Sequence, residues 1–440
     1  MKAPASSKIV RGTIGALALG RAGVAHWRHQ AKQDVSAQTQ DEHEAELGRI
    51  LFRALNQLKG TALKLGQMLS LEAGFLPEGV RLELSKTCYQ ATPVNRALVH
   101  KLFRAELGQA PEQLFAKFDA NAHAAASLGQ VHLAQCHDGH KLAVKIQYPG
   151  IAASIQSDIA MLGLVLKNFA RHSTLLPRQE VIDHVLLEVS QKLTEELDYQ
   201  HEAEQLAWFA ERVVNPNILI PHVFTHLSSR RVLSMQRIKG LHLQAWLASK
   251  PSQAERNHFG QLLFDWFWTC VSDLGRIHAD PHAGNFLFVP NENTCDENPF
   301  GKLAVLDFGC TKTLSPEFCA SMKQCWQAWR SSPPDSASLY QVYVDLGFIA
   351  ENFDFNIFCD QLQAAIEPLY VWQLEPYQAD RFDFKQKSAF PHAQLRNNEL
   401  AQKMSKFNTE LPYFGRAYMG LMHMLHQMEA VVNTKNPFLE

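Results

Sequence analysis

The sequence lacks three features that would each point to a particular class of protein. No stretch reaches the ~18 consecutive apolar residues that span a bilayer, so we expect no transmembrane segment. The net charge of −2 over 440 residues gives no reason to expect a nucleic-acid partner. The eight cysteines include no C-x-x-C pair, so we predict neither a zinc module of that type nor a disulfide framework. The remaining expectation is a cytoplasmic protein with reduced thiols, soluble or peripheral to the inner face of a membrane.

Acidic residues are missing from the first 33 positions, where six lysines and arginines surround the small, apolar run Thr13–Gly20. A basic amphipathic helix lying on an anionic membrane fits this pattern, so residues 1–33 are predicted to be a basic, membrane-associating segment. A frayed basic terminus fits the pattern equally. A signal peptide fits less well, because the apolar run is short and Arg21 interrupts it.

Polar residues suited to phosphoryl transfer occur in two short motifs. His278, Asp280 and Asn285 read H-x-D-x-x-x-x-N, and Asp307 opens a D-F-G after a short apolar run. Phosphoryl transfer needs an acceptor for the hydroxyl proton and oxygen ligands for the metal that neutralises the phosphates. Asp280 suits the first task, and Asn285 and Asp307 offer the hard oxygens that Mg²⁺ prefers. Apolar residues flank both motifs, so both loops are predicted to connect to short buried strands.

A zinc site is the alternative for the first motif, because His278 and His282 are four residues apart with Asp280 between them. Such a histidine pair needs a helix that points both rings at one ion. Pro281 and Gly284 disfavour a helix at this place. We therefore favour kinase-like chemistry, since two kinase motifs follow each other in the right order and context.

An apolar strand, Leu142–Ile146, carries Lys145 in the pattern of the kinase strand whose lysine reaches the nucleotide phosphates. Just upstream, three alanines stand where a protein kinase has its glycine-rich phosphate cover. Alanine favours helix, whereas glycine allows close wrapping, so we expect a stiffer loop. A second strand, Arg231–Ile238, suits the hinge that holds adenine by its backbone. The predicted nucleotide-binding residues are Ala124, Ala125, Ala126, Ser127, Gln130, Lys145, Met235 and Ile238.

An acidic helical segment, Val181–Phe209, contains candidates for the carboxylate that orients the phosphate-binding lysine. Glu196 and Glu202 are six residues apart, which is about 120° around a helix, so they suit two different lysines. We assign Glu202 to Lys145 as a catalytic pair. Glu196 is assigned, together with Asp198, to a lysine of the N-terminal region. A solvated acidic helix is the alternative.

The region before the kinase motifs is predicted to be helical, because apolar residues recur three and four apart between Glu42 and Leu71. Within it, Lys64 and Gln67 share a helix face. Gly66 lies between them and costs helix stability, which suggests the close approach of another group. The predicted organisation is a basic segment over 1–33, a helical K-x-G-Q extension over 34–115, a kinase-like N-lobe over 116–238 and a kinase-like C-lobe over 239–440.

With K-x-G-Q, the alanine loop, E-L-D, H-x-D-P-H-x-G-N and D-F-G in this order, the chain resembles the UbiB family of atypical kinases, also called the AarF or coenzyme Q-associated kinases. The match runs from about Leu47 to beyond Gly309. The resemblance implies an α+β, bilobal protein-kinase-like fold with a small antiparallel-sheet N-lobe, a helical C-lobe and extra N-terminal helices over the substrate entrance. It also implies a family-specific gate near the nucleotide, formed by Lys64, Gly66, Gln67, Glu196 and Asp198.

The function implied by the resemblance is an ATPase or atypical kinase that uses ATP and Mg²⁺ and supports isoprenoid-quinone (ubiquinone) biosynthesis or related lipid metabolism. Implied partners are the nucleotide, an isoprenoid lipid or quinone intermediate, and quinone-biosynthesis proteins. The sequence departs from the family pattern at Ala283, at Gln236 in the hinge and at Cys310 after the D-F-G. Many bacterial members end in a hydrophobic helical hairpin that this sequence does not show, which shifts the expected membrane contact to the basic N-terminal segment.

Two other functions are open to a chain with these motifs. A nucleotide-gated scaffold for a lipid-biosynthetic complex would bind ATP without turnover, although every catalytic position is filled here. An ordinary Ser/Thr protein kinase is disfavoured by the alanine loop, by the preceding helices and by the lack of a recognisable A-P-E after Asp307.

Overall fold

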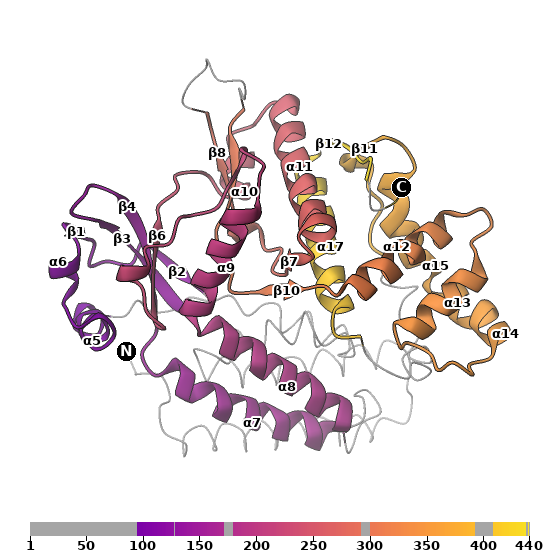
Figure 1. Cartoon of the computed structure of the whole chain (residues 1–440), viewed down its shortest axis with the longest axis horizontal. Helices are drawn as coiled ribbons and strands as arrows, with labels where there is room; N and C mark the ends of the chain where they lie inside the picture. Colours follow the sequence, from indigo (N-terminus) through magenta and orange to yellow (C-terminus); the bar gives the residue numbers. More distant parts are fainter. Residues whose placement is uncertain are drawn as a thin grey trace, which may run out of the picture. The chain divides into compact units, whose positions relative to one another are not determined.

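The computed structural model describes residues 95–126, 128–170, 179–291, 300–391, 408–436 and 439 (Figure 1). The chain divides into two compact units. The first holds residues up to Glu204 together with His222–Arg237, and the second holds Gln205–Pro221 together with Ile238 and the residues after it. Residues 1–33, Lys64, Gly66, Gln67 and Ser127 lie outside the described residues.

The first unit contains an antiparallel sheet in the order β1-β3-β4-β6, with β2 added beside β3. Its strands are β1 (Lys117–Phe118), β2 (Ala124–Ala126), β3 (Gly129–Gln135), β4 (Lys141–Gln147) and β6 (Val232–Gln236). Strand β4 lies at the centre, with Lys145 opposite Val131 on one side and Leu233 on the other. It extends the predicted strand by one residue at each end.

The alanine run differs from its expected conformation. Residues Ala124–Ala126 form strand β2, paired with β3 from Ala124 opposite Val131 to Ala126 opposite Gly129. The helix preference of three alanines is weak, and backbone pairing with an established strand outweighs it. Gly129 at the far end of this pairing is required by close packing, because a Cβ atom there would lie 2.2 Å from the carbonyl oxygen of Ile146.

The first unit also contains helices. They are α5 (Arg96–Leu107), α6 (Pro111–Leu114), α7 (Ile151–Ala170), α8 (Gln179–Glu196) and the start of α9 (Tyr199–Arg212). Asn95 caps α5 by accepting a hydrogen bond from the Leu98 backbone nitrogen. The core joins apolar residues of α5, such as Val99 and Phe103, to Leu142 and Val144 of β4.

The acidic helix predicted over Val181–Phe209 is two helices. Helix α8 ends at Glu196, and α9 starts at Tyr199. The break occurs at Asp198, whose Oδ1 accepts hydrogen bonds from the backbone nitrogens of Gln200 (3.1 Å) and His201 (3.3 Å). These bonds satisfy two of the four amide groups that a helix leaves unpaired at its start, so Asp198 is an N-cap.

A buried histidine, His132, lies in the sheet of the first unit. His132 in β3 stacks on Phe118 with the ring centres 5.0 Å apart. Its Nδ1 lies 2.7 Å from the Asp119 carbonyl oxygen, and its Nε2 lies 2.7 Å from the Gln130 amide nitrogen. Burial lowers the pKa of His132, although the Asp119 carbonyl and carboxylate act in the opposite direction. The imidazole is therefore neutral in the fold at neutral pH.

We expect the free energy of unfolding to fall as the pH drops below the ordinary histidine pKa of ~6.5, because the unfolded chain then binds the proton first. The contribution of His132 is at most ~1.4 kcal/mol per pH unit. Urea unfolding at several pH values between 7.5 and 5.5, followed by circular dichroism, gives the slope of unfolding free energy against pH. This slope should be smaller for His132→Gln than for the wild type. His137→Gln, at an exposed position of the same hairpin, should keep the original slope. Equal slopes in both variants would exclude His132 as the cause.

Three small sheets lie within the described residues of the second unit. Strands β5 (Ile218–Leu219), β9 (Lys302–Val305) and β8 (Phe286–Val289) form one, β7 (Arg276–His278) pairs with β10 (Thr311–Thr313), and β11 (Arg381–Asp383) pairs with β12 (Val431–Asn433). Its longer helices are α11 (Gln253–Trp268), α12 (Pro316–Arg330), α13 (Ser336–Asp345), α15 (Ala364–Leu374) and α17 (Leu411–Met428). Short helices are α10 (Leu243–Ala248) and α14 (Phe355–Ile357).

The segment Phe259–Ile277 is rich in Leu, Phe and Trp, so the sequence predicts a buried helix there. Helix α11 is largely buried, but it starts earlier and ends at Trp268. A capping box starts it, because Ser252 accepts from the Glu255 backbone nitrogen while Glu255 accepts from that of Ser252. The helix continues as a π-helical turn over Thr269–Asp273. Gly275, with φ +58°, then redirects the chain into β7, so the predicted helical end at Ile277 is wrong.

The segment 353–391 is aromatic and contains Pro368, Pro376 and Pro391, so the sequence predicts irregular structure with breaks at these prolines. The segment is instead mostly helical. Asp354 caps α14, a π-helical turn follows over Phe358–Gln363, and α15 continues through Pro368. The aromatic residues that suggested irregular structure instead line a core, with Trp329 stacked on Tyr370 at 4.9 Å. Pro368 lies inside α15, where it removes one backbone donor without ending the helix, so the predicted break at this proline is wrong.

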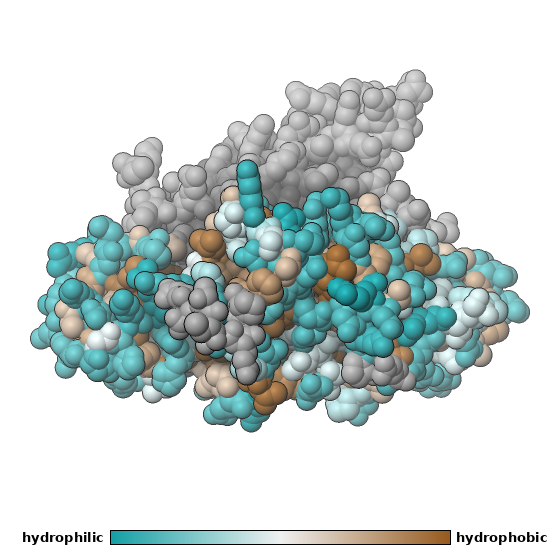
Figure 2. Space-filling model, turned by 90° about the horizontal axis from the view of Figure 1, so that it is seen from above, coloured by the Kyte–Doolittle hydropathy of each residue, from teal (hydrophilic) through white to brown (hydrophobic). Residues whose placement is uncertain are grey.

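No helix among the described residues is both long and apolar enough to cross a membrane. The face shown in Figure 2 is mainly hydrophilic, with hydrophobic residues scattered over it.

Candidate active site

A buried ion pair joins sheet and helix in the first unit. Lys145 Nζ donates to both carboxylate oxygens of Glu202, at 3.0 and 2.9 Å. The two side chains are only 8% and 2% exposed. A buried charge is costly unless it is paired and hydrogen-bonded, so this geometry fixes the lysine at the centre of β4. The arrangement is the one in which a helix carboxylate orients a phosphate-binding lysine.

Tyr199 completes this cluster and was missed in the sequence. The Lys145 ammonium lies 5.0 Å from the centre of the Tyr199 ring, within the range of a cation–π contact. Tyr199 and Glu202 are three residues apart at the start of α9, so they share one face of the helix. That spacing was present in the sequence directly after E-L-D, and combined with the Glu202 assignment it predicts a residue beside the lysine.

The other predicted nucleotide-binding residues lie in different surroundings. Ala124 is exposed on β2. Gln130 is buried beside His132. Met235 is buried in β6 opposite Ala143, whereas Ile238 belongs to the second unit. Their contact with a nucleotide remains a prediction.

The predicted gate residues are only partly described. Asp198 caps α9, and its Oδ2 lies 3.6 Å from Arg230 Nε. Glu196 is the last residue of α8 and is half-buried. The pairing predicted between these carboxylates and Lys64 involves a residue outside the described ranges, so it stays a prediction.

In the second unit, strand pairing brings the metal-ligand candidates together. Strands β8 and β9 are antiparallel with Phe286 opposite Val305, so Asn285 before β8 and Asp307 after β9 lie at one end of the ladder. The Leu306 backbone nitrogen donates to the Asn285 carbonyl oxygen at 2.9 Å and extends the ladder by one step. The expectation that both motifs connect to short buried strands is confirmed.

The pairing of β7 with β10 brings the D-F-G to the catalytic loop. His278 lies opposite Thr311, and the Ala279 backbone nitrogen donates to the Cys310 carbonyl oxygen at 2.9 Å. The His278 Nε2 also hydrogen-bonds the backbone oxygen of Asp307. Burial lowers the pKa of His278, against the charges of Asp280 and Asp307, so the ring is neutral and Nε2–H donates.

Hydrogen bonds inside the loop set the direction of its polar groups. Asn285 Nδ2 donates to the backbone oxygen and to Oδ2 of Asp280, each at 3.1 Å. The amide nitrogen of Asn285 thus faces Asp280, and its oxygen is left to act as an acceptor or ligand. Asp307 Oδ1 accepts from the Gly309 backbone nitrogen at 3.0 Å, which orients this carboxylate.

The donor set of Asn285 and Asp307 fits Mg²⁺, which is bound by a few protein oxygens together with phosphate oxygens and water. The zinc alternative gains no support from the geometry. No group of three or more His, Cys, Asp or Glu residues that could hold a metal is present in the described part of the chain. His278, one of the two histidines in that alternative, uses its Nε2 for the Asp307 carbonyl oxygen.

These features define a class. A helix glutamate paired with a strand lysine, an H-x-D-x-x-x-x-N loop and a D-F-G on paired strands are the parts of a protein-kinase-like fold. The ABC1 atypical kinase-like domain matches residues 86–344, and the chain belongs to this family, the UbiB or AarF family. The family and the α+β, bilobal kinase-like fold expected from the sequence are thereby confirmed.

Named relatives are similar over most of the chain. The mitochondrial atypical kinase COQ8 of Saccharomyces cerevisiae is 27% identical over 393 residues, which is 88% of this chain and 74% of the yeast protein. The AarF domain-containing protein kinase 1 of Xenopus laevis is 28% identical over 353 residues, 78% of this chain and 66% of the relative. A solved Mycobacterium tuberculosis structure, the complex of Rv3197 with erythromycin, is 24% identical with a TM-score of 0.60. It covers 91% of this chain and 100% of its own, and supports the fold alone.

Proposed function

We propose that the protein is an ATP- and Mg²⁺-dependent atypical kinase or ATPase that supports isoprenoid-quinone (ubiquinone) biosynthesis or related lipid metabolism. The observation that carries the proposal is the complete set of phosphoryl-transfer groups in their expected local geometry. Lys145 is held by Glu202 in the first unit. Asp280 is hydrogen-bonded to Asn285 in the second unit, where the strand ladders also place Asp307.

Each side chain has a distinct role in the proposed reaction. Lys145 binds nucleotide phosphate oxygens, and Glu202 keeps its ammonium in place. Asn285 and Asp307 supply oxygen ligands to Mg²⁺, which neutralises phosphate charge when it is bound with ATP. Asp280 accepts the proton of the attacking oxygen. A water molecule as nucleophile gives hydrolysis of ATP, and a hydroxyl group of a lipid or small molecule gives a kinase.

The lipid part of the proposal rests on the family and on the naming of its relatives. The yeast relative is called an atypical kinase and is mitochondrial. For this chain we propose an isoprenoid lipid or quinone intermediate and quinone-biosynthesis proteins as partners, with peripheral contact to a membrane. The K-x-G-Q extension and the basic segment 1–33, which would form the gate and the membrane contact, remain part of this proposal.

The deciding experiment is steady-state phosphate release from MgATP by the purified protein. It should be run with and without anionic liposomes, and with and without a phenol that mimics a quinone precursor. We expect basal release that increases with both additions. Tight MgATP binding with no release under any condition would contradict catalysis and favour the nucleotide-gated scaffold. Phosphate release that does not change with liposomes or phenol would support the ATPase activity and contradict the proposed link to lipid metabolism.

A further inference from the structure

Helix α17 packs closely against the loop that carries Asp280. Gly420, in the middle of α17, faces Pro281, the residue that directly follows Asp280. A Cβ atom at Gly420 would lie 2.1 Å from Pro281 Cβ and 3.2 Å from its carbonyl oxygen. Real Cβ atoms do not approach other carbons so closely, so any side chain at this position must displace either the helix or the catalytic loop.

One turn earlier, the same helix contacts the loop Asp307–Cys310, called here the metal-binding loop because Asp307 is the proposed Mg²⁺ ligand. Arg416 Nη2 donates to the Cys310 Sγ at 3.3 Å, and Cys310 directly follows the D-F-G. The Arg416 guanidinium lies 5.5 Å from the centre of the Tyr413 ring, and the Lys312 ammonium lies 5.1 Å from the same ring. Lys312 belongs to β10, which pairs with β7, so Tyr413 and Arg416 of α17 both contact residues that follow the D-F-G.

Arg416 and Gly420 are four residues apart and therefore lie on one face of α17. One helix face thus contacts the residue after Asp280 and a residue after the D-F-G. The strand ladders hold the two loops together at their backbones, and α17 contacts both outside those ladders.

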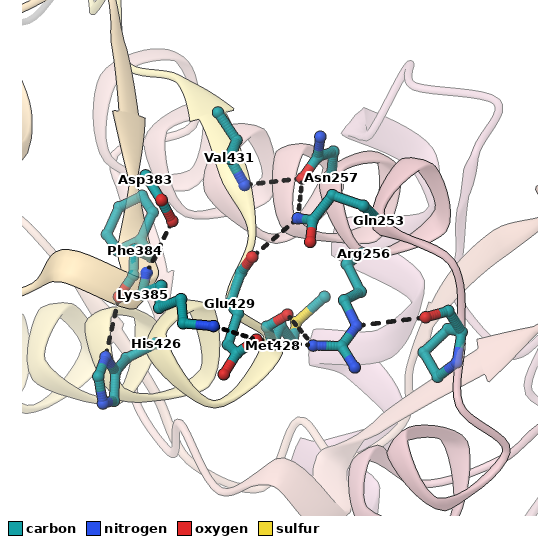
Figure 3. A network of polar contacts seen from close by, with 11 residues as sticks. Gln253, Arg256, Asn257, Asp383, Phe384, Lys385, His426, Met428, Glu429 and Val431 are labelled. Carbon is teal, nitrogen blue, oxygen red and sulfur yellow. Dashed lines mark hydrogen bonds and ion pairs between the residues drawn. The ribbon is translucent and has the colours of Figure 1, made fainter.

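Both ends of α17 are fixed to the rest of the second unit. At its start, the Glu410 carboxylate accepts from the Ser315 backbone nitrogen at 2.6 Å and from its hydroxyl at 3.1 Å. At its end, Glu429 turns the chain with φ +49° and accepts from Arg256 of α11 at 3.2 Å, while Gln253 donates to the Glu429 carbonyl oxygen at 2.9 Å (Figure 3). The helix is therefore anchored at both ends. A substitution on the face that carries Arg416 and Gly420 is expected to displace the two loops rather than the helix.

We propose that α17 positions the reacting groups, with Gly420 setting the catalytic loop at Asp280 and Arg416 setting the metal-binding loop after Asp307. The inference rests on the proposed function for its effect on turnover, but the packing that it concerns is independent of the substrate. Displacements of about 1 Å in a catalytic geometry lower rates by about 100-fold, so such a support is expected to matter more for turnover than for folding.

The chain offers a matched pair of glycines for the test. Gly420→Ala introduces a methyl group against Pro281, whereas Gly415→Ala, in the same helix, meets no described atom within 4 Å. Both changes gain helix propensity. We expect Gly420→Ala to lower kcat for MgATP by about 10- to 100-fold with KM within about twofold. Gly415→Ala should retain both constants and the thermal midpoint.

Amide hydrogen exchange of the same variants tests the positioning role of α17 independently of whether the protein hydrolyses ATP. Gly420→Ala should speed exchange in the peptides covering 276–285 and 307–313, and Gly415→Ala should not. This result would stand even if the wild-type protein proved to have no turnover. Unchanged exchange and unchanged kcat in Gly420→Ala would overturn the role of α17.

Arg416 is tested by its conservative replacement. Arg416→Met removes the hydrogen bond to Cys310, and Arg416→Lys retains a donor and the charge. We expect the methionine variant to need a several-fold higher Mg²⁺ concentration for half-maximal phosphate release, and the lysine variant to recover most of the difference. A loss of thermal stability without any change in the Mg²⁺ requirement would mean that Arg416 contributes to packing and does not position the metal-binding loop.

Discussion

Asp280→Asn should lower phosphate release from MgATP by about 100- to 10,000-fold, the range expected when a proton acceptor is removed. The substitution is a clean one because the Asp280 Oδ2 accepts from Asn285 Nδ2, and the oxygen of an asparagine at 280 accepts the same bond. The loop and the affinity for MgATP should therefore persist. Steady-state phosphate release and isothermal titration with MgATP measure the two quantities on the same sample.

Asp273→Asn is the matched control, because Asp273 is an exposed carboxylate just before the same loop. It should retain turnover and nucleotide affinity. If Asp280→Asn kept more than about a third of the wild-type rate, Asp280 would not be the proton acceptor. If it lost nucleotide affinity as well as turnover, the residue would act in binding, and the role of the loop would need to be reassigned.

The second-unit motifs were predictable because short apolar strands flank them. A buried strand on each side of a polar loop leaves the loop residues little freedom, so Asn285 and Asp307 could be placed together from the sequence. The Lys145–Glu202 pair was predictable for a different reason. A lysine in the middle of an apolar strand requires a carboxylate partner, and the acidic helix supplied few candidates.

What could not be predicted depends on contacts between residues far apart in the sequence. Nothing near Gly420 indicates that Pro281, 139 positions earlier, occupies the space of its missing side chain. The alanine run became a strand because β3 offered pairing partners, which local propensity does not reveal. The helix break at Asp198 is different, since an aspartate at a helix start is a local signal that could have been read as an N-cap.

The buried ion pair should show strong coupling between its two side chains. Glu202→Leu leaves the Lys145 ammonium buried without its carboxylate, and Lys145→Met leaves the Glu202 carboxylate buried without its ammonium. Each single variant is expected to lose about 3–5 kcal/mol of unfolding free energy. The double variant Lys145→Met/Glu202→Leu replaces both charges with apolar groups and should lose far less than the sum of the single losses. Urea unfolding followed by circular dichroism gives all four values.

Measurements of phosphate release distinguish the contribution of this pair to folding stability from its role in the reaction. All three variants should lack phosphate release from MgATP, because the double variant restores the packing but not the ammonium that binds phosphate. The exposed pair of Arg96 and Glu112, at 2.9 Å with side chains 65% and 49% exposed, is the control, and Glu112→Leu should change stability by under about 1 kcal/mol. Additive losses at Lys145 and Glu202 would mean that the two charges are not coupled. A stable double variant that still released phosphate would remove Lys145 from the reaction, because no ammonium would remain at the centre of β4.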